Sequence, residues 1–305
     1  MQIAGIWSSI VVAPHAGRPN PTGTITMIHF APSRGADAMR RPVPHQAPAH
    51  EGLARLPGVK LWYSDTGGGG PAVVLVHPYT GSGLIWRYQQ PVLAAAGCRV
   101  IAYSRRGHFG SDAGPKDDPG SAADDLRDLM DALAVDRFHA VGLAQGGVIA
   151  MDFALSYPRR LLSMIAASTL LGITDDCYLE ISEGLRPRGF DGMPQEFREL
   201  GPSYRASNPE GVRRWIELER RACHARVAQR RNNTITLAAL RTVRVPTLLI
   251  TGDADLFTPP AVLRIHAEHL PDNEALVIPE SGHSVYWEQP DAFNAAALAF
   301  IAKHR

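Results

Sequence analysis

The chain has 305 residues, which suits one large α/β domain or two smaller ones. Its formal net charge of +1 excludes the strong positive field that would favour nucleic acid or an acidic membrane surface as a partner. Hydrophobic residues make up 45% of the chain, as in an ordinary soluble protein, and no apolar run reaches the roughly 18 residues of a membrane span.

The cysteines and histidines argue against a metal or a cofactor. Cys98, Cys177 and Cys223 are odd in number and lack metal-binding spacing, so we expect free thiols in a reducing compartment and a cytoplasmic protein. The histidines form no H-E-x-x-H motif, and the chain has neither a P-loop nor a G-x-G-x-x-G turn after a strand. We therefore expect no metal, no cofactor and no nucleic-acid partner.

The first fifty residues read as a leader. Residues 14–50 are rich in Pro, Ala, Gly, His and Arg, a composition that buries little surface. The mildly apolar start lacks the positive segment of a signal peptide, which argues against a signal peptide. We expect residues 1–50 to be flexible.

From residue 59 onward, strand-like and helix-like segments alternate. Expected strands cover residues 61–64, 72–76, 99–103, 138–141, 162–168, 247–251 and 275–278, and expected helices cover 87–96, 121–133, 148–156 and 291–303. The run at 72–76 is continuously apolar, as in a strand buried on both faces. The alternation predicts an α/β core, at residues 51–171 and 245–305, with a mostly parallel sheet covered by helices on both faces.

Residues 172–244 break this alternation. Charged, helical sequence replaces the hydrophobic runs, and Ser207-Asn208-Pro209-Glu210 is a good helix start. We expect a helical cap over the carboxyl ends of the strands, where ligands bind in open α/β sheets. The alternative is a solvated bundle with no contact to a substrate.

A sharp turn separates the strand at 138–141 from the helix that follows it. Its sequence is Gly142-Leu143-Ala144-Gln145-Gly146. The pattern G-x-S-x-G between a strand and a helix is a nucleophile elbow, in which the serine attacks a carbonyl carbon. Ala144 takes the place of that serine, and a methyl group cannot attack.

On these motifs, residues 59–305 resemble the α/β-hydrolase family. The resemblance implies a triad of a nucleophile, an acid and a histidine in chain order, which places Ala144, Asp255 and His283 in those roles. The carboxylate would hold the imidazole in its useful tautomer, and the imidazole would move the proton. Asp253 is an alternative acid. A more distant alternative is the pair at 175–176.

The resemblance also implies an oxyanion hole. Residues 76–82 are similar to the family's His-Gly-x loop, so the backbone N–H groups of Tyr79 and Gln145 are the expected donors. Pro78 replaces the usual glycine, yet the donor should come from position 79. We expect His77 to organise the loop, and the arginine-rich stretch at 104–112 to fix its neighbours.

Aromatic side chains near these loops are candidates for an apolar substrate pocket, although each could equally be core packing. They are Trp86, Tyr178, Trp215, Phe257 and Trp287, with Tyr286 beside the last. Cap arginines could hold a substrate carboxylate, or could form a solvated charged face.

These residues predict a serine hydrolase of small carboxylic esters or lactones with an apolar acyl or aryl part, here inactive because an engineered change gave Ala144. Two alternatives stay open. One is a natural, non-hydrolytic binding or sensor protein on the same scaffold. The other is a lyase, perhydrolase or carbon–carbon bond hydrolase that uses the same histidine and aspartate.

Overall fold

The computed structural model describes residues 39–305, so most of the expected leader lies outside the described residues. One sheet forms the centre of the molecule. Its strands are β1 (His50–Leu56), β2 (Val59–Asp65), β3 (Ala72–Val76), β4 (Arg99–Tyr103), β5 (Phe138–Leu143), β6 (Leu161–Ala167), β7 (Thr247–Gly252) and β8 (Asn273–Ile278). They lie in the order β1-β2-β4-β3-β5-β6-β7-β8. β2 runs antiparallel to both of its neighbours, and the other neighbouring strands pair in parallel. The expected mostly parallel α/β sheet is therefore confirmed.

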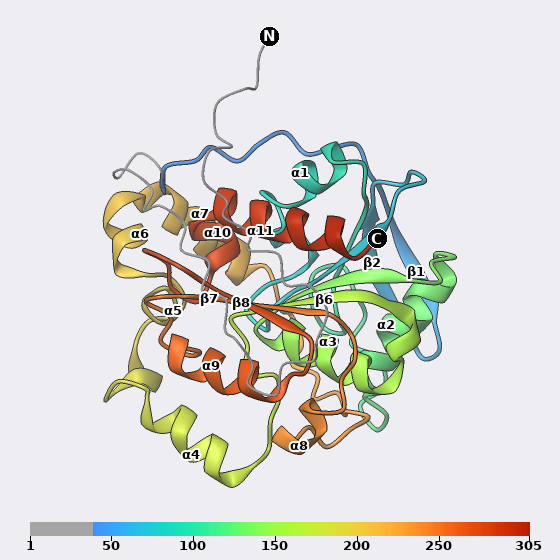
Figure 1. Cartoon of the computed structure of the whole chain (residues 1–305). Helices are drawn as coiled ribbons and strands as arrows, with labels where there is room; N and C mark the ends of the chain where they lie inside the picture. The colour runs from blue at the N-terminus through green and yellow to red at the C-terminus, as the bar shows by residue number, and fades with distance from the viewer. Residues whose placement is uncertain (1–38) are drawn as a thin grey trace.

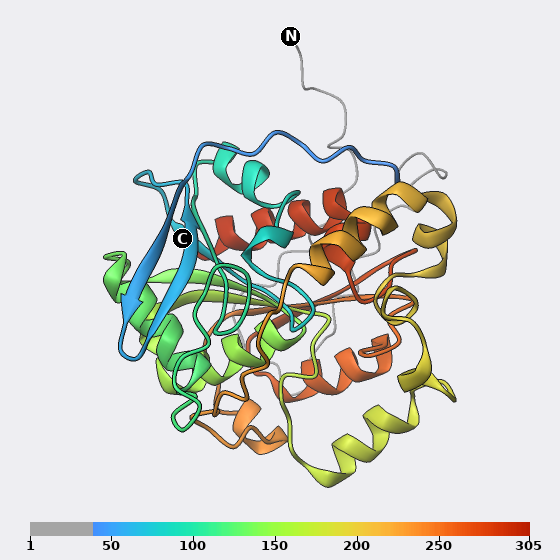
Figure 2. The same ribbon diagram turned by 180° about the vertical axis from the view of Figure 1, so that it is seen from behind.

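Helices cover both faces of this sheet. They are α1 (Gln90–Ala95), α2 (Ala122–Ala132), α3 (Gln145–Ser156), α4 (Asp176–Gly184), α5 (Gln195–Glu199), α6 (Pro202–Ser207), α7 (Pro209–Arg220), α8 (Leu237–Leu240), α9 (Pro260–His269), α10 (Val285–Glu288) and α11 (Pro290–Lys303). α1 and α11 lie above the sheet in Figure 1, and α2, α3 and α9 lie below it. The opposite view shows the same layers, with α4 to α7 gathered at one side (Figure 2).

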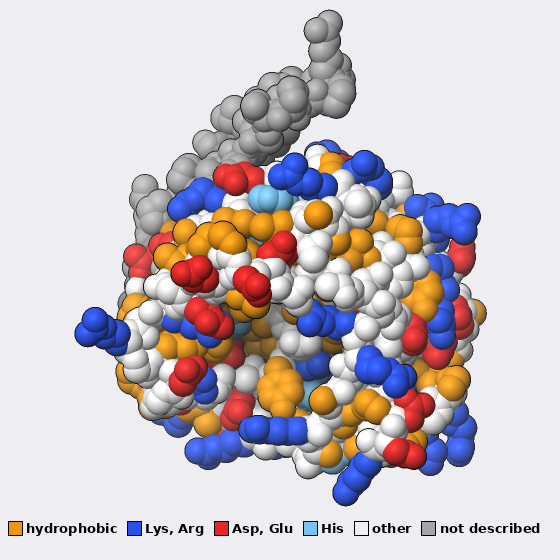
Figure 3. All heavy atoms as spheres, turned by 90° about the horizontal axis from the view of Figure 1, so that it is seen from below, with side chains coloured by type: hydrophobic (Ala, Val, Ile, Leu, Met, Phe, Trp, Pro, Cys, Tyr) orange, Lys and Arg blue, Asp and Glu red, His pale blue; other side chains and the backbone are white. Residues whose placement is uncertain are grey.

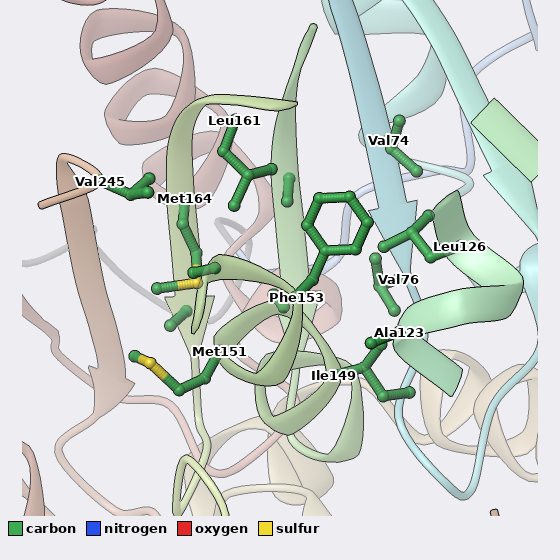
Figure 4. Close-up of a cluster of buried hydrophobic side chains, with 14 of the residues drawn as sticks. Val74, Val76, Ala123, Leu126, Ile149, Met151, Phe153, Leu161, Met164 and Val245 are labelled. Atoms are coloured by element: carbon green, nitrogen blue, oxygen red, sulfur yellow. The ribbon is translucent and has the colours of Figure 1, made fainter. Parts of the chain in front are cut away.

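The core below the sheet forms because α2 and α3 turn apolar side chains toward β3 and β6. Ser121 caps α2, and its Oγ accepts a hydrogen bond from the Asp124 N–H at 3.4 Å. On the buried side of α2, Ala123 and Leu126 pack toward Ile149 and Phe153 of α3 (Figure 4). This packing fixes the start of α3, and with it the turn after β5.

Three details of the expected fold are wrong. β1 was not expected, because its sequence HEGLARL carries only one buried residue, and its pairing with β2 forms it. α1 begins at Gln90 rather than at residue 87, since a short 3₁₀ turn at Gly83–Ile85 precedes it. α3 begins at Gln145 rather than at residue 148, because close packing overrides the low helix propensity of Gly146 and Gly147.

The described part of the expected leader, residues 39–49, makes hydrogen bonds to the core. The Asn208 side chain donates to the Met39 carbonyl at 2.8 Å, and the Tyr88 hydroxyl donates to the Arg41 carbonyl at 2.8 Å. Gln90 exchanges two hydrogen bonds with the Ala47 backbone, at 2.9 and 2.8 Å. These contacts join the segment to α1 and to the start of α7.

No helix within residues 39–305 is both long and apolar enough to cross a membrane. The same residues contain no group of His, Cys, Asp and Glu side chains arranged to hold a metal ion.

Candidate active site

The turn between β5 and α3 holds Ala144 in a strained conformation. Its φ of 48° and ψ of −111° lie outside the regions that non-glycine residues usually adopt. The Ala144 N–H donates to the Ala167 carbonyl of β6 at 2.9 Å. A Cβ added to Gly146 would lie 1.9 Å from the Val76 carbonyl oxygen, so glycine lets the elbow approach β3 closely.

Asp255 and His283 meet beside this elbow. Asp255 follows β7 and His283 follows β8, and the carboxyl ends of these paired parallel strands lie at the same edge of the sheet. The His283 Nδ1 lies 2.9 Å from both carboxylate oxygens of Asp255. The carboxylate also accepts hydrogen bonds from the backbone of Phe257 and Thr258 and from the Thr258 hydroxyl, at 2.6 to 2.9 Å.

These contacts set the charge of the pair. Burial alone would raise the pKa of Asp255, but the charge and hydrogen bond of His283, together with the bonds from Thr258, lower it below its usual value. Burial alone would lower the pKa of His283, but Asp255 and then Glu199 raise it above 6.5. The Asp255 carboxylate therefore stabilises the imidazolium that forms once the neutral histidine has accepted a proton.

The alternative acids have other partners. Asp253 accepts a hydrogen bond from the Ser281 N–H at 3.2 Å, so it shapes the turn beside the histidine loop. Asp175 accepts from the Leu237 N–H at 2.8 Å, and Asp176 is exposed in the first turn of α4. None of these carboxylates is hydrogen-bonded to His283.

The loop after β3 begins directly beside the elbow. His77 Nδ1 lies 2.7 Å from the Pro78 carbonyl oxygen, and His77 Nε2 accepts from the Arg105 N–H at 3.0 Å, so His77 holds the loop with both ring nitrogens. Among the described residues, the N–H groups of Tyr79 and Gln145 have no acceptor. Both residues line the same cavity, as oxyanion-hole donors must.

The cavity has a volume of about 710 Å³. Loops of the sheet supply Tyr79, Ala144 and His283 to its wall, and the expected cap supplies Glu199 and residues 219, 220 and 223–226. Phe257 lines it as well, with its ring 4.5 Å from the His283 ring. One face of the molecule, seen from below Figure 1, mixes basic and acidic side chains, with no continuous region of one sign (Figure 3).

Four of the five aromatic residues expected in the pocket do not line it. They are Trp86, Tyr178, Trp215 and Trp287, each at most 4% exposed. Their polar atoms explain part of this burial. Trp215 Nε1 donates to the Ser284 hydroxyl at 3.2 Å, Trp287 Nε1 donates to the Gly211 carbonyl at 3.3 Å, and the Tyr178 hydroxyl lies 2.8 Å from His266 Nε2. Trp86 packs against Tyr286 in the core.

Known proteins share this arrangement of elements. The sequence model of the alpha/beta hydrolase family matches residues 73–296, most of the chain. The chain belongs to this family.

The relatives within the family have diverse activities. A dihydrolipoyllysine-residue acetyltransferase component of the acetoin cleaving system from Pseudomonas putida is 30% identical over 288 residues, covering 90% of this chain and 74% of that protein. A 2-hydroxy-6-oxo-6-phenylhexa-2,4-dienoate hydrolase from Burkholderia cepacia is 28% identical, covering 81% of this chain and 93% of that protein. The solved structure of a thermophilic esterase from Thermogutta terrifontis is 25% identical, with a TM-score of 0.65, and covers 85% of this chain and all of that one.

Sequence reasoning missed one buried charge in this hydrolase site, Glu199 at the end of α5. Its carboxylate lines the cavity and accepts hydrogen bonds from the side chains of Gln195, at 2.9 Å, and Thr80, at 3.4 Å. Its backbone carbonyl accepts from the Ser284 N–H at 2.9 Å. Burial raises the pKa of Glu199, and the charge of His283 partly offsets this. In sequence Glu199 is one acid among many in a charged segment, so no local signal distinguishes it.

Proposed function

We propose that this chain is a hydrolase of small carboxylic esters or lactones in which alanine occupies the nucleophile position. One observation carries the proposal. His283, which is hydrogen-bonded to Asp255, lines a cavity together with Ala144 and with Tyr79 and Gln145, whose backbone N–H groups have no acceptor among the described residues.

The chemistry of such a site requires a hydroxyl at position 144. A serine oxygen would attack the ester carbonyl while His283 takes its proton, and the N–H groups of Tyr79 and Gln145 would stabilise the tetrahedral oxyanion. His283 would return the proton to the departing alcohol, and water would release the acid from the acyl-enzyme by the same steps. With Ala144 no acyl bond can form, and loss of a triad nucleophile costs about 10⁶-fold in rate.

The lining of the cavity supports a small substrate with an apolar part. Phe257 and Leu170 form apolar stretches of its wall, and residues of α5 and α7 line it as well. We therefore assign residues 172–244 as a cap that covers the substrate. The three cysteines are free, which supports a reducing, cytoplasmic setting.

Ala144 itself favours a second candidate, a natural binding or sensor protein on the hydrolase scaffold. Such a protein would bind ligands in the same cavity, and a restored hydroxyl would not turn binding into cleavage.

The test is the A144S variant, assayed with a panel of short-chain aryl esters and lactones. Our proposal predicts a burst of released alcohol followed by turnover, and the double variant A144S/D255N should be slower by several orders of magnitude. A folded A144S variant that binds these compounds without a burst or turnover would overturn the proposal and favour the binding protein.

A further inference from the structure

Arg105 is a buried cation behind the oxyanion loop, and none of the described acidic side chains forms an ion pair with it. The residue is 7% exposed, and its Nε has no hydrogen-bond partner among the described residues. Its Nη2 donates to the Pro78 carbonyl at 3.2 Å. The neighbouring Arg106 differs, because its guanidinium makes two 2.7 Å bonds to Asp125.

The surroundings leave the charge of Arg105 uncompensated. Burial lowers the pKa of Arg105 to about 10, which keeps the guanidinium charged at neutral pH. Burial, and then Arg105, lower the pKa of His77 well below its usual value and that of His108 to about 4, so both stay neutral. A buried charge without an oppositely charged partner is costly, which indicates that an anion completes this region.

The peptide between Pro78 and Tyr79 links Arg105 to the cavity. Three groups hold the Pro78 carbonyl oxygen: His77 Nδ1 at 2.7 Å, and Arg105 Nη2 and the Gly81 N–H at 3.2 Å each. The C=O and N–H of a trans peptide point in opposite directions, and no described peptide bond is cis. The Tyr79 N–H therefore points away from Arg105, and Tyr79 lines the cavity.

We propose that the alanine-containing site binds a carboxylate anion. One carboxylate oxygen accepts from the N–H groups of Tyr79 and Gln145. The other accepts from His283 Nε2, in the space that a serine hydroxyl would need. Arg105 supplies the compensating charge behind the loop. The ligand class is a small carboxylic acid, the product class of ester hydrolysis, so the inference rests on the oxyanion hole assigned above.

Other charged side chains also line the cavity. They are the basic Arg198, Arg220 and Arg226, the imidazole of His224, and the acidic Glu199 and Glu219. Glu199 is the buried one of the two acids, and it is close enough to His283 to raise its pKa. An ionised Glu199 repels a bound carboxylate, so its removal should strengthen binding.

Titration calorimetry on the unaltered chain tests this proposal with butyrate and phenylacetate as probes. Their neutral isosteres, butyramide and phenylacetamide, are the matched ligands. We expect each carboxylate to bind at least about tenfold more tightly than its amide. R105M should remove that preference, R105K should keep most of it, and E199Q should increase it. R55M, at an exposed position on β1, is the control for a general loss of positive charge.

Equal affinity for carboxylate and amide, or no binding of any probe at millimolar concentration, overturns the proposal. A folded R105M that keeps the preference overturns it as well. If R105M does not fold, E199Q decides, because weaker carboxylate binding in that variant contradicts the assigned geometry. None of these results affects the outcome of the A144S assay. If the carboxylate proposal is refuted, the proposed hydrolase function is therefore not refuted with it.

Discussion

Gly146 tests how closely the elbow must approach the oxyanion strand. In G146A the new Cβ would lie 1.9 Å from the Val76 oxygen and 3.0 Å from the His77 oxygen. An ordinary carbon–oxygen contact is about 3.3 Å, so β3 and α3 must separate by roughly 1.4 Å. β3 is fully buried and so is most of α3, and overpacking of this kind costs about 3 kcal/mol or more of unfolding free energy.

Guanidinium denaturation of G146A measures this loss. G184A is the matched control, because a Cβ at the last residue of α4 meets no atom within 4 Å. That change should leave stability unaltered or raise it by about 0.5–1 kcal/mol. In the A144S background, G146A should also abolish turnover by displacing the oxyanion loop. A G146A protein as stable as G184A would refute the close-approach argument.

Two further predictions concern buried charges. D125N removes the carboxylate partner of buried Arg106 and should lower the unfolding free energy by about 3–5 kcal/mol in denaturant titrations. D118N, at an exposed ion pair, should lower it by at most about 1 kcal/mol. Equal losses would contradict the burial argument. In the A144S variant the rising limb of kcat/KM with pH should follow the raised pKa of His283, because only neutral imidazole accepts a proton. E199Q should move that limb to lower pH, and an unmoved limb or a shift to higher pH would show that Glu199 does not act on His283.

The sequence predicts the parallel part of the fold because those strands are locally encoded. The valine-rich run of β3 and the apolar runs of β5 and β7 are fully buried, so hydrophobicity alone marks them. β1 is different, because six of its seven residues are at least partly exposed and pairing with β2 forms it. Residues 39–49 are held by the packing of Met39 and Val43 and by hydrogen bonds to their backbone, and the backbone bonds carry no side-chain signal.

The same difference between local sequence signals and long-range contacts holds for the site. Ala144, Asp255 and His283 lie within short motifs at the ends of strands, so topology alone brings them to one edge of the sheet. The pocket aromatics are predicted from their positions near the active-site loops, and four of the five are buried in the core instead. Glu199 is distinguished by its burial and its hydrogen-bond partners, and Arg105 by its burial without an acidic partner. Only the folded chain reveals these surroundings.

The most direct measurement of the central claim is the intact mass of the A144S variant after reaction with a fluorophosphonate, which adds covalently to an activated serine. We predict one adduct per chain at position 144, and a rate at least about 10³-fold lower when H283A is added. Failure of folded A144S to react, or an equal rate with and without His283, would contradict the claim that the histidine and its carboxylate serve position 144.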